Sequence, residues 1–453
     1  MLYHGSVRNE DRPPLQNGTV IHGCVAEHGG GGVVLPPGDG VSPEQLIAFT
    51  IFVVCFALIL YRKFKILYIS LAAAAILVIL GIVTPLQVVL QAINWDVLGI
   101  YFGFGMLSIA FGESQVPKYI AFEIMRRVKT ERWAIFWLAA VAAALSSVMP
   151  NPVVVMMLAP IAIEVSQRFE SSLFNYLVPL AISSNVVTTV TMFADPPAII
   201  LAMETGMRFF DFYWFQGRIG LGDISMVGVV AALLSLLLIY RKLDKGVAFT
   251  PEPLEVSYGA GILFLAGVLA LAFIPISPGV ISLAVGIVAL AICPMSKVTM
   301  FKEFDWDSFL FIIGIFVVVA SIEITGLLAA FSAWFVSLGI TSPTLILAFL
   351  VWISVLLSAF IDNVPYTILM IPVCTQIAGA MGVSPFPFLF GMLIGTGIGG
   401  NLTPVGATAN VIACGILEKR GYKIDLWEYM KISLPFTVIA TGVGHLLLQL
   451  IWL

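Results

Sequence analysis

Charged residues are scarce in this chain of 453 residues, where only 11% are charged and 60% are hydrophobic. Soluble domains carry about 25% charged residues, so this composition excludes an ordinary soluble protein. The small formal net charge of −4 excludes the strongly basic surface of a typical nucleic-acid-binding protein, and we expect no nucleic-acid partner. Several apolar runs of about 18 residues are each long enough to cross a bilayer. The composition therefore predicts a polytopic α-helical protein embedded in the lipid bilayer.

Cysteine and histidine are rare too, with five and four residues. The cysteines lack the paired spacing of a zinc site, and four of them lie in apolar segments, so we interpret them as buried free thiols. Three histidines lie near the N-terminus at a spacing that fits no tetrahedral metal site. His445 is the only histidine in a predicted span, and no span pairs it with a nucleophile. We therefore expect no enzyme activity, no metal site and no cofactor.

A phosphate-binding loop of the type G-x-x-x-x-G-K is also absent. A primary pump would therefore need a separate ATPase subunit, which is a possible partner. Residues 1–43 contain Gly29–Gly32 and several prolines but no hydrophobic core of a signal peptide. We expect this N-terminal tail to be flexible.

The most informative stretch is Leu357–Gln376, which is apolar at both ends and carries Asp362-Asn363 in the middle. A carboxylate at membrane depth costs at least a few kcal/mol and usually marks a functional site. A second copy, Leu145–Gln167, lies in the first half of the chain and has Asn151 where the later stretch has Asn363. The two copies predict the tips of two re-entrant hairpins in an internally duplicated protein.

Two further segments, Ser183–Pro197 and Gly395–Asn410, are too polar for lipid contact. Irregular backbone at membrane depth is tolerated only inside protein or against a water-filled cavity. Thr189 and Asn401 correspond at the same offset that separates the asparagines of the two hairpin tips. These segments therefore predict two broken helices, one in each repeat.

The pattern divides the chain into an N-terminal tail (1–43), a first repeat (44–245), a linker (246–256) and a second repeat (257–453). Each repeat has five spans and one hairpin. The pair Trp95-Asp96 recurs as Trp306-Asp307, one residue off the common spacing. The fold class predicted is an all-α polytopic membrane protein with two repeats and broken helices at the midplane.

Basic residues set the orientation, because cytoplasmic loops carry an excess of Lys and Arg. The clusters that we place in the cytoplasm are Arg62–Lys65, Lys118–Arg132, Arg168, Arg241–Lys245, Lys297–Lys302 and Lys419–Lys431. This arrangement puts both termini outside. An odd number of spans in each repeat then makes the second repeat inverted. Inverted repeats with paired broken helices are typical of secondary transporters.

The hairpin tips and breaks should meet near the midplane, where free amide and carbonyl groups of broken helices attract ions. Asparagines and threonines add neutral donors and acceptors, and glycines either let backbone approach a ligand or serve helix packing. The candidate binding residues are Asn151, Asn185, Thr188, Thr189, Thr191, Asp195, Asp362, Asn363, Gly399, Gly400, Asn401, Thr403, Gly406, Thr408 and Asn410.

Asp362 is the best candidate for ion coupling, because a buried carboxylate can hold either a proton or a sodium ion. The first repeat has Pro150 at the matching position and lacks the charge. Asp195 is the other carboxylate in a break and directly precedes Pro196-Pro197. Its role stays open between an ion ligand and an N-cap of the helix that resumes there.

These motifs resemble the ion transporter superfamily and, within it, the ArsB/NhaD group of permeases. Gly399–Lys431, Asp362-Asn363-Val364-Pro365 and Asp195-Pro196-Pro197 look like the P-protein-like branch of that group. The resemblance covers nearly all of 44–453. It implies a homodimer in which a mobile transport domain carries the substrate past a scaffold by elevator-like motion.

The chain departs from relatives that move dicarboxylates, in which both hairpin tips carry Ser-Asn-Thr. Here the tips are Pro150-Asn151-Pro152 and Asp362-Asn363-Val364. Only the asparagines match, which argues against a dicarboxylate. Many close relatives also have an acidic residue at the first tip, so its absence argues against a symmetric two-cation site.

The function expected is a secondary active transporter for a small inorganic solute, coupled to H⁺ or Na⁺, with arsenite or antimonite efflux as the first choice. A sodium/proton antiporter and a sodium-coupled carboxylate or other anion symporter are the alternatives, and a channel is the alternative of another class. We expect an integral protein of a bacterial inner membrane.

Overall fold

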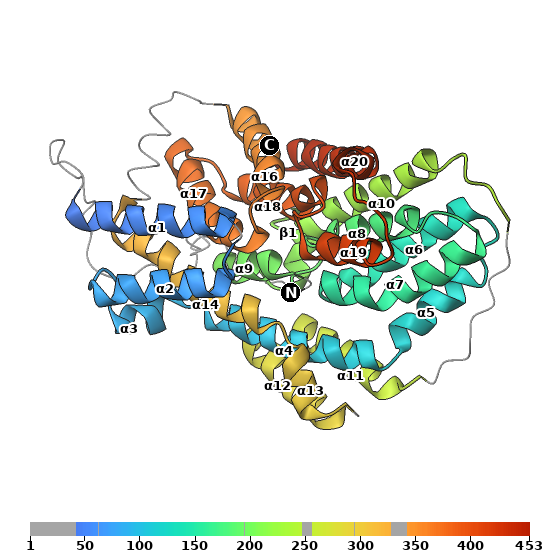
Figure 1. Ribbon diagram of the computed structural model, residues 1–453. Helices are drawn as coiled ribbons and strands as arrows, with labels where there is room; N and C mark the ends of the chain where they lie inside the picture. The colour runs from blue at the N-terminus through green and yellow to red at the C-terminus, as the bar shows by residue number, and fades with distance from the viewer. Residues whose placement is uncertain (1–41, 62, 194, 247–255, 294, 328–341) are drawn as a thin grey trace, which may run out of the picture.

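The computed structural model describes residues 42–61, 63–193, 195–246, 256–293, 295–327 and 342–453. The N-terminal tail predicted over 1–43 lies outside the described residues except for its last two, as does most of the predicted linker. The described chain is almost wholly helical (Figure 1).

The first half runs from the helix that begins at Pro43 to the one that ends at Ile239. Its helices are α1 (Pro43–Tyr61), α2 (Ile66–Ile79), α3 (Pro85–Gln87), the π-helix η1 (Val88–Ala92), α4 (Trp95–Glu113), α5 (Val116–Met125), α6 (Glu131–Ser146), α7 (Asn151–Arg168), α8 (Phe174–Asn185), α9 (Pro196–Thr205), the 3₁₀ helix η2 (Phe209–Phe212) and α10 (Leu221–Ile239).

The second half repeats this order. Its helices are α11 (Tyr258–Phe273), α12 (Pro278–Ile292), α13 (Lys297–Glu303), α14 (Trp306–Ile324), α16 (Pro343–Ser358), α17 (Asn363–Met381), α18 (Phe386–Gly399), the 3₁₀ helix η3 (Gly400–Leu402), α19 (Thr408–Glu418) and α20 (Leu426–Trp452). Among the described residues five helices are long and apolar enough to cross a membrane, namely α4, α10, α14, α17 and α20.

One small β-hairpin lies within the otherwise helical chain. Strands β1 (Trp214–Phe215) and β2 (Arg218–Ile219) form an antiparallel hairpin. Gln216 and Gly217 between them both have positive φ, at 50° and 77°. Two such residues make the tight turn that suits the twist of a hairpin, and the sequence around them carries no longer β pattern.

The duplication extends to the helix boundaries. Helices α6, α7, α8 and α9 begin at residues 131, 151, 174 and 196, and α16, α17, α18 and α19 begin at 343, 363, 386 and 408. Each start in the second half therefore follows its counterpart at one constant offset, the same that separates the asparagines of the two tips. Helices α4 and α14 begin at 95 and 306, a spacing one residue shorter, as the repeated Trp-Asp pair predicts.

The two halves interlock. Helix α4 packs along α12, the counterpart of α2, and α2 packs along α14, the counterpart of α4. In the same way α7 packs on α19 and α9 packs on α17. Contacts exchanged in pairs are what a two-fold relation between the halves would produce.

The helices are interrupted where the sequence predicts the two hairpin tips and the two breaks. Non-helical backbone joins α6 to α7 and α16 to α17, and it also follows Asn185 and Thr403 within the broken segments. Pro152, Pro196 and Pro365 each lie in the first turn of a helix that resumes after an interruption. Proline suits that place because it needs no donor there and its φ is already helical.

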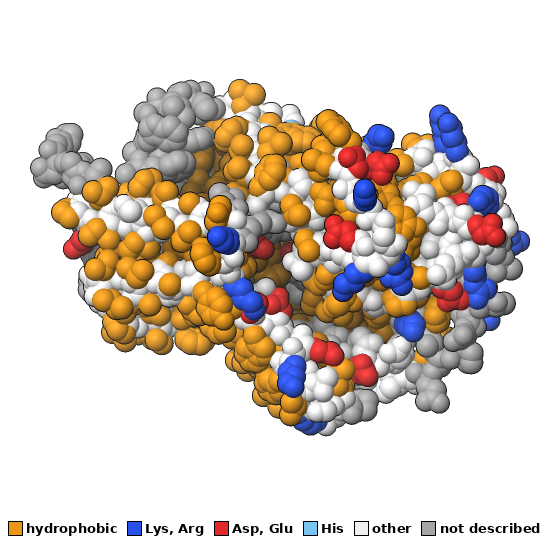
Figure 2. Space-filling view, in the orientation of Figure 1, with side chains coloured by type: hydrophobic (Ala, Val, Ile, Leu, Met, Phe, Trp, Pro, Cys, Tyr) orange, Lys and Arg blue, Asp and Glu red, His pale blue; other side chains and the backbone are white. Residues whose placement is uncertain are grey.

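The surface separates two kinds of side chain. In Figure 2 hydrophobic side chains dominate over α1 and α2, where Phe49 and Tyr68 are exposed. Most of the Lys and Arg side chains of this face gather at the other end of the molecule, beyond α19 (Figure 2). An exposed apolar helix surface of this kind suits contact with lipid chains.

Candidate functional site

Both hairpin tips and both resuming helices meet at one cavity of about 370 Å³. Four helices direct their N-termini to its wall, namely α7, α9, α17 and α19. Asn151, Asp195, Asp362 and Thr408 lie at these helix starts and line the cavity. The sequence predicted that the tips and breaks converge, and the structure brings them together.

Four buried asparagines form one hydrogen-bonded group, which we name the amide cluster: Asn151, Asn185, Asn401 and Asn410. Asn151 Nδ2 donates to Asn185 Oδ1 at 3.3 Å. Asn185 Nδ2 donates to Asn401 Oδ1 at 2.9 Å and to Asn410 Oδ1 at 3.0 Å. The cluster therefore ties the first hairpin tip to both broken helices.

The outer bonds of the amide cluster reach the backbone where the helices break. Asn401 Nδ2 donates to the carbonyl oxygen of Ile182 at 2.9 Å, and Asn410 Nδ2 to that of Gly400 at 3.0 Å. Asn151 Oδ1 is buried and has no hydrogen-bond partner, and its residue lines the cavity. A buried acceptor without a partner is costly, so this oxygen is available to a solute in the cavity.

The second hairpin tip is held differently. Asp362 is the N-cap of α17, and its Oδ1 accepts from the backbone N–H of Val364 at 3.0 Å. Asn363 Oδ1 accepts from Ser358 Oγ at 2.6 Å. These two hydrogen bonds hold the tip at the cavity wall. Capping is one role of Asp362, and its carboxylate also faces the cavity.

The sequence left Asp195 open between an ion ligand and an N-cap. It has the extended conformation of an N-cap, with φ −143° and ψ 144°, but its side chain accepts no capping bond. Pro196 and Pro197 have no N–H to donate, and the N–H of Ala198 donates to the backbone carbonyl of Asp195 instead. Asp195 lines the cavity and interacts electrostatically with Asp362. A role of this carboxylate as an ion ligand stays a prediction.

Seven of the predicted residues line the cavity and eight do not. The lining residues are Asn151, Asn185, Asp195, Asp362, Asn363, Gly406 and Thr408. The others lie behind the wall and are Thr188, Thr189, Thr191, Gly399, Gly400, Asn401, Thr403 and Asn410.

The threonines behind the wall hold the breaks in place. Thr189 Oγ1 donates to Ser225 Oγ of α10 at 2.8 Å, and Thr403 Oγ1 donates to the carbonyl of Ala359 at 2.9 Å. Thr191 bonds the Ser147 carbonyl next to the first tip. These bonds connect each broken helix to a neighbouring element.

The glycines serve mainly close packing. A Cβ at Gly399 would lie 2.4 Å from the Val355 carbonyl oxygen, so the glycine lets α18 approach α16. A Cβ at Gly406 would lie 2.3 Å from the Gly400 oxygen, within the second break. The packing interpretation of these glycines therefore fits better at Gly399 and Gly400, while Gly406 also lines the cavity.

The opposite wall consists of residues that the sequence motifs did not predict. They come from α4, from the end of α13 and from the start of α14: Tyr101, Phe104, Ser108, Glu303, Asp305 and Ser308. Tyr101 Oη donates to Asp305 Oδ2 at 3.3 Å. The repeated Trp-Asp pair, which adjoins Asp305, was the available signal that the start of α14 carries a function.

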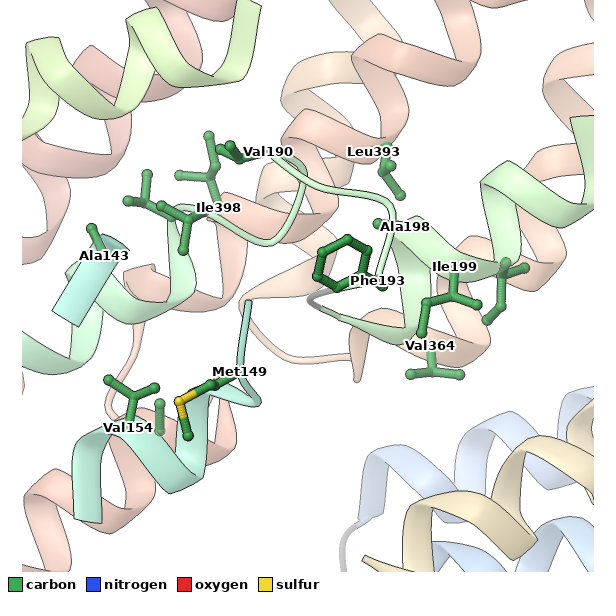
Figure 3. Packing of buried hydrophobic residues seen from close by; sticks show 14 of the residues in the cluster. Ala143, Met149, Val154, Val190, Phe193, Ala198, Ile199, Val364, Leu393 and Ile398 are labelled. Carbon is green, nitrogen blue, oxygen red and sulfur yellow. The ribbon is translucent and has the colours of Figure 1, made fainter. Parts of the chain in front are cut away.

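An aromatic contact joins the two walls. The rings of Phe104 and Phe193 lie 4.6 Å apart between centroids. In Figure 3 the Phe193 ring lies close to Ala198 and Ile199 of α9, with Met149 of the first tip and Val364 of the second on either side.

The charges at the cavity have one sign. Asp195, Asp362, Glu303 and Asp305 line it, and none of its lining residues in the described chain is Lys, Arg or His. Helices α7 and α19 begin without a side-chain capping bond, so their N-termini keep a positive potential. The site therefore offers carboxylates to a cation and amides to oxygen atoms of a solute.

Among the described residues no group of three or more His, Cys, Asp or Glu side chains could hold a metal ion. Cys374 and Cys414 are buried and do not line the cavity. The chemistry available at the site is therefore that of oxygen ligands and hydrogen bonds.

Comparison with known proteins gives consistent matches. The family profile CitMHS, described as citrate transporter, matches residues 56–395 and, in a second match, residues 268–452. An uncharacterized transporter of Mycobacterium tuberculosis is 26% identical over 424 residues, which are 90% of this chain and 98% of that protein. The human P protein is 24% identical over 503 residues, covering 89% of this chain and 59% of its own length.

Among solved structures, the Alcanivorax borkumensis YdaH transporter has a similar fold, with a TM-score of 0.55 at 13% identity. The match covers 90% of this chain and 98% of that one. At this identity the likeness concerns the fold alone. It agrees with an integral membrane protein that has several membrane-spanning helices.

Proposed function

This chain belongs to the CitMHS family of the ion transporter superfamily, with the P protein and the mycobacterial transporters among its relatives, and from that premise we propose what it transports. Because it belongs to this family, the protein is a secondary transporter and not an enzyme. The proposal is a proton- or sodium-coupled exporter of a small, uncharged inorganic solute of the arsenite or antimonite type.

One observation carries this choice: the cavity where the tips and breaks meet has carboxylates and no basic side chain. A multiply charged anion such as citrate would face Asp195 and Asp362 without an Arg or Lys to pair with. An uncharged hydroxide of arsenic carries no such penalty. Its O–H groups can donate to the unpaired Asn151 Oδ1, and its oxygens can accept from N–H groups at the N-termini of α7 and α19.

A sodium/proton antiporter is the second candidate, and the pair of carboxylates favours it. Two acidic groups that interact across a cavity bind a cation or protons in competition. In that case the amide cluster would only shape the site. A carboxylate symporter fits the family description but not the charges of the cavity wall.

The architecture that we propose for transport is an elevator formed by two inverted repeats. The matched helix starts and the exchanged packing pairs support the duplication. Helices α4 and α14 would belong to the scaffold, and the hairpins with the broken helices would move past it. We propose in addition a homodimer in a bacterial inner membrane, with both termini outside.

Orientation is tested by labelling single cysteines placed near Lys63, Arg127, Lys242 and Arg420. We expect all four positions to react only from the cytoplasmic side, because basic loops stay there. Labelling of Arg127 and Arg420 from opposite sides would contradict the inverted repeats.

Transport is tested by flux into vesicles that contain the purified protein. Proton and sodium gradients are imposed separately, and arsenite, citrate and no solute are compared under each. We expect arsenite accumulation that depends on one gradient. Citrate accumulation alone would favour the symporter, and ion exchange without any added solute would favour the antiporter.

A further inference from the structure

Helices α4 and α14, which the proposed elevator assigns to the scaffold, begin in the same way. Asn94 caps α4, where its Oδ1 accepts from the backbone N–H of Val97 at 3.2 Å. Asp305 occupies the corresponding place before α14, where its Oδ1 accepts from the N–H of Ser308 at 3.0 Å. The two caps are therefore equivalent positions in the two repeats, and one carries an amide where the other carries a carboxylate.

The helix packed beside each start holds it in an equivalent way. Asp96 accepts a hydrogen bond from Ser277, the N-cap of α12. Asp307 accepts from Lys65 Nζ at 2.8 Å, and Lys65 is the N-cap of α2, the counterpart of α12. The scaffold thus presents matching contacts at both starts. A difference in what the two caps face beyond the scaffold must come from the hairpins and broken helices.

Such a difference exists. Asn94 Nδ2 donates to Glu204 Oε1, near the end of α9, at 3.0 Å. Asp305 instead lines the cavity. The residue of α19 at the place of Glu204 is Ile416, whose aliphatic side chain can neither donate nor accept a hydrogen bond. The counterpart of the Asn94–Glu204 bond therefore cannot form between Asp305 and Ile416.

Packing shows which helices lie against the scaffold. Helix α9 packs on α4 and α17 packs on α14, whereas within the described chain α19 has no comparable packing on α14. Matched apolar residues differ accordingly in exposure. Ile199 of α9 is 2% exposed and Val411, at the same place in α19, is 47% exposed. Ile368 of α17 is 6% exposed and Met156, at the same place in α7, is 53% exposed. The scaffold therefore covers α9 and α17 and leaves α7 and α19 open.

Elevator motion would exchange the covered helix pair for the open one. Val411 and Met156 would then become covered, and the distance between Asn94 and Glu204 would grow. Two halves with matching helices offer similar packing in both states. A hydrogen bond that exists in only one of them shifts the equilibrium toward that state.

We propose that the Asn94–Glu204 hydrogen bond is a latch that makes the two states unequal and favours, at rest, the state described here. Both are positioning residues, since neither lines the cavity. The proposal rests on the elevator proposed above and adds the contact that sets its resting position. With the basic segment Lys297–Lys302 in the cytoplasm, the cavity wall at Asp305 lies on the cytoplasmic side and the latch on the outer side. A resting exporter would thus be open to solute from the cytoplasm.

The test compares how fast two single cysteines react with a maleimide in the purified full-length protein, without any solute. Val411→Cys and Ile199→Cys are the reporters, and mass spectrometry of each labelled peptide measures its position separately. With the latch intact we expect Val411→Cys to react at least about tenfold faster, as for a minor state of a tenth or less. Glu204→Leu removes the acceptor and should lower this ratio of rates about fivefold.

Asn94→Asp removes the donor and keeps a cap, as Asp305 does for α14, so it should lower the ratio about fivefold as well. Glu204→Gln is the matched control, because its amide oxygen still accepts from Asn94, and it should keep the original ratio.

Equal rates at the two reporters with the latch intact would overturn the proposal, and so would an unchanged ratio in Glu204→Leu or Asn94→Asp. A loss in Glu204→Gln as large as in Glu204→Leu would assign the effect to charge and overturn it too. If one variant failed to fold, the other would decide. No solute is present, so a wrong choice of solute would leave the result intact, and an unchanged ratio would leave the transport assay unaffected.

Discussion

The two hairpin tips occupy equivalent places and carry different chemistry. The first tip, Pro150-Asn151-Pro152, is neutral, and its asparagine joins the amide cluster through Asn185. The second tip carries Asp362, which caps α17, and Asn363, which is held by Ser358. The helix starts match at one constant offset, whereas the side chains at the two tips differ. The two tips therefore share their backbone position but not their charge.

The difference in charge between the two tips follows the way in which the helices pair. Helix α9 packs on α17, and these two helices begin with Asp195 and Asp362 at their N-caps. Helix α7 packs on α19, and these begin with Asn151 and Thr408, with Asn410 in the next positions. One helix pair therefore presents carboxylates to the cavity, and the other presents the amide of Asn151 and the hydroxyl of Thr408. We propose that the coupling ion binds at the first pair and the solute at the second.

The largest effect is expected from Asp362→Asn, which removes the charge from the carboxylate pair. Gradient-driven transport should fall at least ~10-fold, equivalent to about 1.4 kcal/mol, while equilibrium exchange of an uncharged solute persists. Reconstituted flux measured against pH gives the comparison. Pro150→Ala at the matching position of the first tip is the control and should keep its coupling. Wild-type rate and pH dependence in Asp362→Asn would leave capping as its role and make Asp195 the next candidate.

On the amide side, Asn185→Ala removes the centre of the cluster. Asn401 and Asn410 then lose a buried donor, and stability should fall by about 2 kcal/mol. Thermal unfolding in detergent measures the loss. Asn175→Ala at the start of the same helix is the control, since Asn175 lies outside the amide cluster. An unchanged Tm in Asn185→Ala would show that the amide cluster does not stabilise the contact between the two broken helices.

Gly397→Ala tests the contact between the breaks themselves. A Cβ there would lie 2.1 Å from Thr188 Oγ1 and 3.2 Å from Thr189 Cγ2. Moving these atoms should lower the stability of the fold by about 1–2 kcal/mol, which Tm measures. It should also slow transport, which flux on the same preparation measures. At Gly415 in α19 a Cβ meets nothing within 4 Å, so Gly415→Ala should behave like wild type. Equal behaviour of both variants would contradict the close approach.

The smallest effect is expected from Tyr101→Phe on the opposite wall. The variant removes the hydroxyl that donates to Asp305 at 3.3 Å and that also interacts electrostatically with Asp195. Loss of one such bond should lower the transport rate about fivefold, or about 1 kcal/mol. Initial rates at two pH values measure it. A larger loss than in Asp362→Asn would mean that the residues of the opposite wall contribute more to ion coupling than Asp362 does.

Much of this site could be predicted from the sequence because its elements are duplicated. The constant offset between the two copies located both tips and both breaks, and polar residues in apolar surroundings identified the lining. Tyr101 of the opposite wall could not be found in this way, because it looks like an ordinary residue of a helix, whereas Asp305 adjoins the repeated Trp-Asp pair. The glycines were ambiguous, since close packing and ligand approach require the same residue.

At Asp195 the sequence could not decide about capping, because Pro196-Pro197 removes the N–H groups of the first two helical positions whereas Ala198 keeps that of the third. Which asparagines bond one another could not be predicted, because Asn185 and Asn401 meet only when the two halves interlock.

The central claim is that movement of the solute and movement of an ion are tied together. Vesicles that contain the wild-type protein would receive an arsenite gradient alone, with pH and sodium equal on both sides at the start. We predict that the arsenite gradient drives protons or sodium in the opposite direction, and that Asp362→Asn abolishes this ion movement. Arsenite that equilibrates in wild-type vesicles without any ion movement would contradict the account.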